Sequence, residues 1–168
     1  IGNQVSGTRG TKGVSEHIIE LLRARGWGIY AASRHENRCA RLSDMLICAF
    51  SHRREYALGV VDVYSGLAFR YAEILSAFLC WMGKPVVLVL HGGGLVEFAR
   101  IHPERLCRFL RRGHTVVTPS RYLRSGLSGL RSDIEYLPNG VDCNHFAFTP
   151  RNRFGPQLCW VRAFNRIY

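Results

Sequence analysis

The chain alternates between short, wholly apolar runs and longer segments in which apolar residues recur at helical spacing. The clearest apolar run is Val86–Leu90, which is typical of a buried strand in a parallel sheet. Gly26 and the segment Gly83–Pro85 mark the ends of two helical segments, because glycine and proline interrupt helices. The pattern predicts strands at residues 1–3, 27–32, 56–63, 86–90, 114–118, 134–137 and 157–161, and helices at 14–25, 39–50, 67–82, 95–110 and 120–130.

The alternation of strands and helices predicts the fold class. It indicates an α/β fold with a Rossmann-like, doubly wound parallel sheet, in which right-handed crossovers bring the loops after the strands to one edge. A polar, proline-flanked stretch near the C-terminus is typical of a linker between domains. We therefore expect a Rossmann-like domain at 1–148, a linker at 149–156 and the start of a second domain at 157–168, with the first strand and the second domain truncated.

The loop after the apolar run Val86–Leu90 is the first candidate site. His91 follows the run directly and is the one titratable residue there, before the glycines Gly92–Gly94. Open α/β sheets bind ligands beyond the carboxyl ends of their strands, and glycines let the backbone approach a ligand and offer free N–H groups. We expect His91 to be catalytic and Gly92 and Gly93 to contact substrate, with a histidine satisfied in the core as the alternative.

Two further loops follow predicted strands at the same edge. Ser120 and Arg121 come after strand 114–118 and are candidate substrate contacts, although helix capping alone explains a serine there. Asn139 is a third candidate contact, and its run Pro138–Asp142 has the composition of a turn. A purely structural role therefore stays open for all three residues.

A glycine-rich loop precedes the helix predicted at 14–25. Its glycines Gly7, Gly10 and Gly13 lack the spacing of a dinucleotide-binding fingerprint, and the loop has no Gly-Lys-Ser/Thr of a P-loop. A loop of this kind at a helix N-terminus can still hold a phosphate group beside basic residues, so the three glycines are candidate substrate contacts. A flexible surface turn is the alternative.

The net charge of +11 results from 21 arginines and two lysines against 12 acidic residues. Guanidinium groups bind phosphate and carboxylate, so anionic partners are expected, although arginines spread over solvated faces fit the count equally well. The helical segment 103–112 is basic on one face and apolar on the other, which fits either a helix packed on the core or one on an anionic membrane surface. No nucleic-acid-binding module is visible, so we expect no nucleic-acid partner.

The six cysteines are scattered and form no C-x-x-C pair. This pattern is unlike a secreted disulfide framework or a zinc site, so we expect a reduced protein without a bound metal or cofactor. The sequence shows no apolar segment of membrane-spanning length. We expect a cytoplasmic protein, with peripheral association at the inner face of an anionic membrane if the arginine-rich helix binds there.

The order of four segments along the chain is more specific than any one of them alone. The segments are Gly7–Gly26, Leu88–Gly94, Val116–Ser120 and Leu137–Asp142. The last of these, with its Pro-Asn-Gly-Val-Asp run before Phe146 and Pro150, is the most specific. Together the segments resemble the amino-terminal domain of the GT-B glycosyltransferases of family 4. The terminal segment Leu158–Phe164 resembles the first strand of the second domain of these enzymes.

The resemblance implies two Rossmann-like domains that face a cleft. The second domain mainly holds a nucleotide-sugar donor and the first mainly holds a glycan or lipid-linked acceptor; the sugar is transferred with retention and usually without a metal. His91 matches the histidine beside the transferred sugar, and the loop Gly7–Gly13 matches the loop that approaches donor phosphate and acceptor. Arg162 matches, by position, an arginine near the donor diphosphate.

The resulting hypothesis is the amino-terminal domain of a retaining glycosyltransferase of polysaccharide biosynthesis, inactive as this chain alone. A sugar-nucleotide epimerase or hydrolase of the same fold is one alternative, and turnover without an acceptor would favour it. A non-catalytic module that binds membranes through Arg105, Arg108 and Arg112 is the other. Vesicle binding that needs these arginines, without any binding of a nucleotide sugar, would favour that second alternative.

Overall fold

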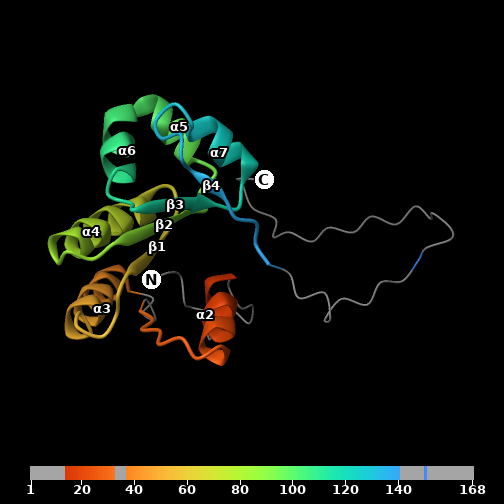
Figure 1. Ribbon diagram of the computed structural model, residues 1–168. Helices are drawn as coiled ribbons and strands as arrows, with labels where there is room; N and C mark the ends of the chain where they lie inside the picture. The colour runs from red at the N-terminus through yellow and green to blue at the C-terminus, as the bar shows by residue number, and fades with distance from the viewer. Residues whose placement is uncertain (1–13, 33–36, 141–149, 151–168) are drawn as a thin grey trace.

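The structure, a computed structural model, describes residues 14–32, 37–140 and 150 (Figure 1). Its central element is a four-stranded sheet in which all strand pairs are parallel and the strand order follows the chain, β1-β2-β3-β4. Parallel neighbours require crossover connections, and a helix fills each of them. The strands are β1 (Gly59–Val63), β2 (Val86–Leu90), β3 (Thr115–Thr118) and β4 (Glu135–Tyr136).

Helices lie on both sides of this sheet, and in the view of Figure 1 α5, α6 and α7 are drawn above the strands and α2 and α3 below them. α4 packs against β1, β2 and α3, whereas α7 packs against β3 and β4. This arrangement confirms the expected α/β, Rossmann-like fold. The helices are α2 (Val14–Ala24), α3 (Arg38–Ser51), α4 (Leu67–Trp81), α5 (Leu95–Ile101), α6 (Pro103–Leu110) and α7 (Arg121–Leu127).

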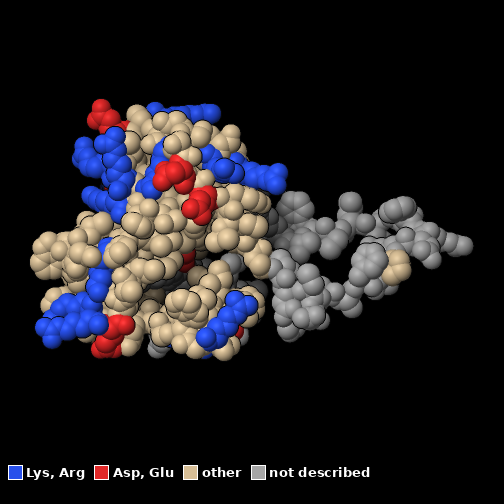
Figure 2. Space-filling view, viewed as in Figure 1, with Lys and Arg blue, Asp and Glu red and all other residues tan. Residues whose placement is uncertain are grey.

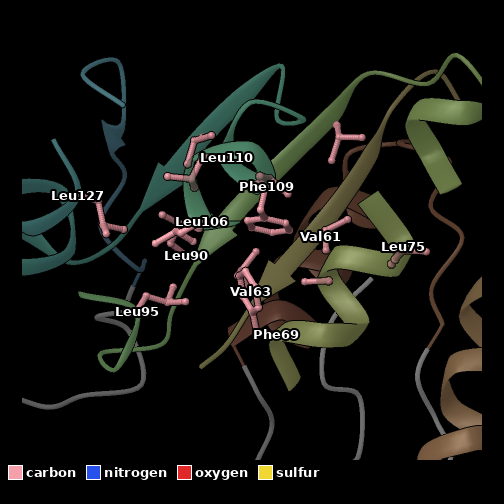
Figure 3. Packing of buried hydrophobic residues seen from close by; sticks show 14 of the residues in the cluster. Val61, Val63, Phe69, Leu75, Leu90, Leu95, Leu106, Phe109, Leu110 and Leu127 are labelled. Atoms are coloured by element: carbon pink, nitrogen blue, oxygen red, sulfur yellow. The ribbon is translucent and has the colours of Figure 1, made fainter. Parts of the chain in front are cut away.

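The core lies between one face of the sheet and the helices that cover it (Figure 3). Alternate side chains of β1 and β2 point to this face, and Phe109 of α6 packs edge-on against Phe69 of α4. Burying each of these large apolar side chains contributes about 1.5–3 kcal/mol to stability. The opposite face is less covered, since Val87 and Val89 are only half-buried. The innermost side chains of the core include Val61, Val63, Leu75, Leu79, Leu88, Leu90, Leu106, Phe109 and Leu110.

The structure divides one predicted helix and omits one predicted strand. The segment 95–110 forms two helices that meet at His102, because the following Pro103 has no N–H and disfavours helical backbone in the residue before it. The segment 27–32 forms no strand, since none of the described strands pairs with it. β1 begins at Gly59, later than the predicted start at residue 56. The strands predicted at 1–3 and 157–161, and the linker at 149–156 apart from Pro150, lie outside the described residues.

α6 turns its apolar face inward. Leu106, Phe109 and Leu110 are at most 1% exposed, so these side chains pack in the core and are not available for insertion into a membrane. The alternative of a core-packed helix with a solvated basic face is therefore correct for this segment. None of the helices in the described part of the chain combines the length and apolar composition that crossing a membrane requires.

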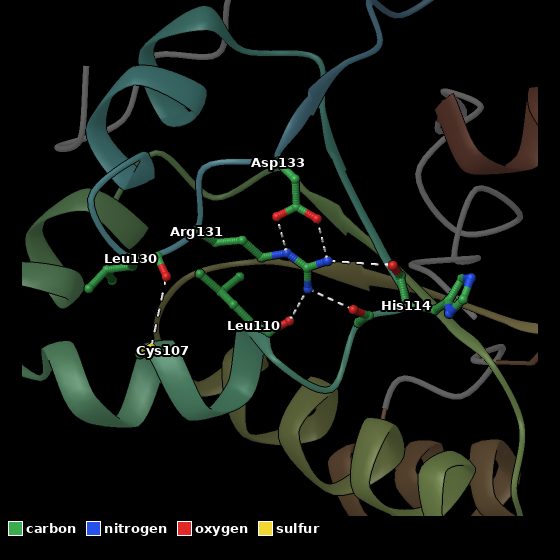
Figure 4. A network of polar contacts seen from close by, with 7 residues as sticks. Cys107, Leu110, His114, Leu130, Arg131 and Asp133 are labelled. Carbon is green, nitrogen blue, oxygen red and sulfur yellow. Dashed lines mark hydrogen bonds and ion pairs between the residues drawn. The ribbon is translucent and has the colours of Figure 1, made fainter.

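Arg131 ties the end of α6 to the start of β3 (Figure 4). Its Nη1 donates to the carbonyl oxygens of Leu110 and Gly113, both at 2.6 Å, and its Nη2 donates weakly to that of His114 at 3.4 Å. Its Nε and Nη2 also form a two-pronged contact with the carboxylate of Asp133, at 2.7 and 2.9 Å. The hydrogen bond from Arg131 lowers the pKa of Asp133 below its ordinary value. One half-buried guanidinium thus binds three backbone carbonyl oxygens of the turn between α6 and β3.

Candidate functional site

The carboxyl ends of the strands meet at one edge of the sheet, as the parallel fold requires. Val63 pairs with Leu90 in the register of β1 and β2, and the N–H of His91 donates to the carbonyl oxygen of Val63 at 2.9 Å. The hydroxyl of Thr118, at the end of β3, donates to the carbonyl oxygen of Leu90 at 2.9 Å. The N–H of Leu137, just past β4, donates to the carbonyl oxygen of Thr118 at 3.0 Å. These bonds fix the loops after the four strands relative to one another.

His91 is held at this edge by two residues of the neighbouring strand and loop. Its Nε2 lies 3.2 Å from Oδ1 of Asp62 in β1, and the side chains of the pair are 17% and 8% exposed. The ring of Tyr64 stacks against the imidazole, with centroids 5.2 Å apart and planes 21° apart. His91 is therefore neither free in solvent nor enclosed by aliphatic side chains.

The contact with Asp62 decides which imidazole nitrogen is available. A buried carboxylate accepts a hydrogen bond, so it favours the form of His91 that carries a proton on Nε2. In neutral imidazole the other nitrogen, Nδ1, then keeps its lone pair and accepts hydrogen bonds. Within the described residues Nδ1 of His91 makes no hydrogen bond, so it is available to a hydroxyl group of a ligand.

Burial raises the pKa of the Tyr64 phenol to about 12, and the nearby Asp62 carboxylate adds to this shift. The ring beside His91 therefore stays neutral at physiological pH and acts through stacking and its hydroxyl group.

We expect the raised pKa of Tyr64 to appear in an absorbance titration of the tyrosines. Wild-type protein should show a phenol that titrates near pH 12, and this step should be lost in Tyr64→Phe. Because the folded state holds this proton more tightly, its contribution to stability is complete below pH 10.0 and is lost as the pH rises toward 12. The same substitution at the exposed Tyr122 controls for the loss of one phenol. Titration of Tyr64 near pH 10 would contradict the packing described here.

The three glycines after His91 differ in what surrounds them. A Cβ atom on Gly92 would lie 2.3 Å from the backbone nitrogen of Ser65. Only glycine therefore leaves room for the backbone of the loop after β1 at this position. A Cβ on Gly94 would lie 3.2 Å from the Ser65 side chain, whereas a Cβ on Gly93 meets nothing within 4 Å. Gly92 therefore has a packing role, whereas Gly93 is exposed and has open space at its Cβ position. Contact of either glycine with substrate stays a prediction.

The remaining candidates on this edge have evident structural partners. Oγ of Ser120 accepts from the N–H of Leu123 at 3.3 Å and so caps the N-terminus of α7. This is the capping role that its position in the sequence indicated. The guanidinium of Arg121 lies 5.2 Å from the ring centroid of Tyr136. Asn139 is exposed beyond β4. The substrate contacts predicted for these residues are untested, and Gly7, Gly10, Gly13 and Arg162 lie outside the described residues.

Sequence reasoning missed Asp62 and Tyr64. A signal for Asp62 was present, because a carboxylate one residue before the end of the strand Gly59–Val63 is costly to bury without a partner. Tyr64 had no comparable signal, since an aromatic residue after a strand is common. Within the described residues no three His, Cys, Asp or Glu side chains are grouped so that they could hold a metal ion.

Comparison with known proteins identifies the family. The sequence model of Glycosyltransferase Family 4 matches residues 41–145, which include the strand edge with Asp62, Tyr64 and His91. Comparisons with curated proteins and with solved structures found no match. The family match covers more than half of the chain and confirms the resemblance to the amino-terminal domain of these enzymes. The chain therefore belongs to Glycosyltransferase Family 4.

Proposed function

We propose that the chain is the acceptor-side domain of a retaining glycosyltransferase, which transfers a sugar from a nucleotide-sugar donor to a glycan or lipid-linked acceptor. The observation that carries this proposal is the pair of His91 and Asp62 at the carboxyl edge of the sheet, with the imidazole partly exposed. The family match supports transferase chemistry at this edge. We place the donor diphosphate at a second domain because the order of the motifs along the chain resembles that of family 4 enzymes.

The geometry gives His91 a specific role in this reaction. As the bond to the nucleoside diphosphate breaks, the sugar becomes more positive and its hydroxyl groups become better hydrogen-bond donors. Nδ1 of His91, with Nε2 held by Asp62, accepts such a bond from a sugar hydroxyl without a change of tautomer. Because the imidazole is already oriented, little reorganisation is needed as the transition state forms. The stacked Tyr64 restricts rotation of the ring.

His91→Ala is the experiment that tests this role. In the two-domain enzyme, we expect the substitution to lower the rate of sugar transfer by about 100-fold, the usual effect of removing one preorganised hydrogen bond at a transition state. The measurement is the turnover of a panel of nucleotide sugars with and without candidate acceptors. An unchanged rate would remove His91 from the mechanism, and consumption of donor without any acceptor would favour the epimerase or hydrolase alternative. The 168-residue chain by itself should show no transfer.

Asp62→Ala provides the matched control for the positioning role. If Asp62 acts only through His91, the double variant should be no slower than His91→Ala alone, because residues in one unit are not additive. Additive losses would show that Asp62 acts on substrate directly. Folding of each variant is checked by circular dichroism, so that a loss of rate is not confused with a loss of structure.

A further inference from the structure

A second site candidate lies between α4 and α6, in a pocket with a volume of about 530 Å³. None of Asp62, Tyr64 and His91 lines it, so it is separate from the strand-edge site. Basic side chains gather on this part of the surface, over α6 (Figure 2). The charged or titratable residues in the lining are Glu73, His102, Glu104, Arg105, Arg108 and Arg112.

Arg105 is the lining residue whose side chain is held by the most contacts. Its Nε donates to Oε1 of Glu73 at 2.9 Å and its Nη2 donates to Oε2 at 2.5 Å. The same guanidinium lies over the rings of Phe69 and Phe98, with centroids 5.8 and 5.7 Å away. Both carboxylate oxygens of Glu73 are therefore engaged by Arg105, and the guanidinium is held in place before any ligand binds.

Arg112 and Arg108 add further positive charge to the lining. Nη1 of Arg112 donates to the backbone carbonyl oxygen of Glu73 at 3.0 Å, which orients the guanidinium. Among the described residues neither arginine forms an ion pair within 4 Å, and Glu104, one turn before Arg108, forms none either. The lining thus carries three guanidinium groups against two carboxylates, one of which is already used.

We propose that the α4–α6 pocket binds a phosphate group. Guanidinium groups present paired N–H donors that match phosphate oxygens, and two of the three arginines here are oriented by contacts with α4. The Phe69 and Phe98 rings beneath Arg105 further restrict its guanidinium. The phosphate is either free in solution or part of a phospholipid headgroup.

The test measures phosphate binding by the 168-residue chain and by three variants. Inorganic phosphate is titrated while the arginine side-chain Nε–Hε signals are followed by NMR. Arg108→Gln is expected to weaken binding about tenfold, since it removes one charge-assisted hydrogen bond, and Arg112→Gln should act similarly. Arg124→Gln, which removes an exposed charge on α7, controls for net charge and should change binding little. Arg108 is exposed, so its variant is expected to fold.

A second arm distinguishes the source of the phosphate. The same proteins are sedimented with vesicles of phosphatidylglycerol and, separately, of phosphatidylcholine. Binding to phosphatidylglycerol vesicles alone, reduced by Arg108→Gln and not by Arg124→Gln, supports the pocket with a lipid headgroup as ligand. Binding of inorganic phosphate with the same pattern supports a free phosphate compound. The proposal is overturned if neither probe binds, or if Arg124→Gln weakens binding as much as Arg108→Gln.

Discussion

Gly92→Ala is expected to lower the free energy of unfolding by about 3 kcal/mol, at the upper end of what overpacking costs. The new Cβ would lie 2.3 Å from the backbone nitrogen of Ser65 and 2.9 Å from the carbonyl carbon of Tyr64. A flexible side chain can rotate away from such an atom, but backbone that is held between β1 and α4 cannot. The measurement is the urea midpoint of the variant beside that of wild type, followed by circular dichroism.

Gly93→Ala is the matched control for this prediction. A Cβ at Gly93 meets no atom within 4 Å, and the backbone there is not in the left-handed region, so the substitution should change stability little. The pair also separates packing from function. If Gly93 contacts substrate, Gly93→Ala lowers turnover in a protein of normal stability. Equal stability of both variants would contradict the close approach of Ser65 to Gly92.

Arg131→Met is expected to cost a similar amount, about 3 kcal/mol, because it leaves a buried backbone oxygen unpaired and removes charge-assisted hydrogen bonds. The carbonyl oxygen of Leu110 keeps a bond from the N–H of Gly113 at 3.1 Å, so the loss falls mainly on the carbonyl oxygen of Gly113. Gly113 is itself buried against Leu88 and Val116, where water does not easily replace the guanidinium. Chemical denaturation measures the change.

Two further variants identify which contact of Arg131 matters. Arg131→Lys keeps the charge but lacks the planar fork, so it should recover only part of the loss. Asp133→Asn should cost much less than Arg131→Met, because the Asp133 side chain is 68% exposed and water can replace its ion pair. A loss in Asp133→Asn as large as that in Arg131→Met would show that the ion pair, and not the backbone contacts, carries the stability.

The Gly92 prediction bears on the function as well. Gly92 and Ser65 keep the loops after β1 and β2 in contact, and the same two loops carry Tyr64 and His91. A site that relies on an oriented imidazole needs this rigid support, because a small displacement of a preorganised group removes much of its effect. The phosphate pocket between α4 and α6 has its own support in the contact between Arg105 and Glu73.

Sequence patterns predicted the fold of the described residues well, for reasons that are local. The apolar run Val86–Leu90 forms β2 with the expected bounds, and α4 ends at Trp81, one residue before the predicted end. Periodic burial, capping and chain breaks all act within a few residues, so they are readable without a tertiary structure. The division at His102 also has a local signal, because Pro103 interrupts a helix. Apolar spacing continues across Pro103, so spacing alone predicts a single helix.

What the sequence by itself determined is therefore the α/β fold, its parallel sheet and the edge at which His91 stands. What only the tertiary structure decided is the identity of partners: Asp62 for His91, Ser65 for Gly92, and Glu73 for Arg105. These partners are 27 to 32 residues apart in the chain. The contacts between these residues depend on strand register and helix packing. Both are set by many long-range contacts together, so the local sequence pattern does not indicate them.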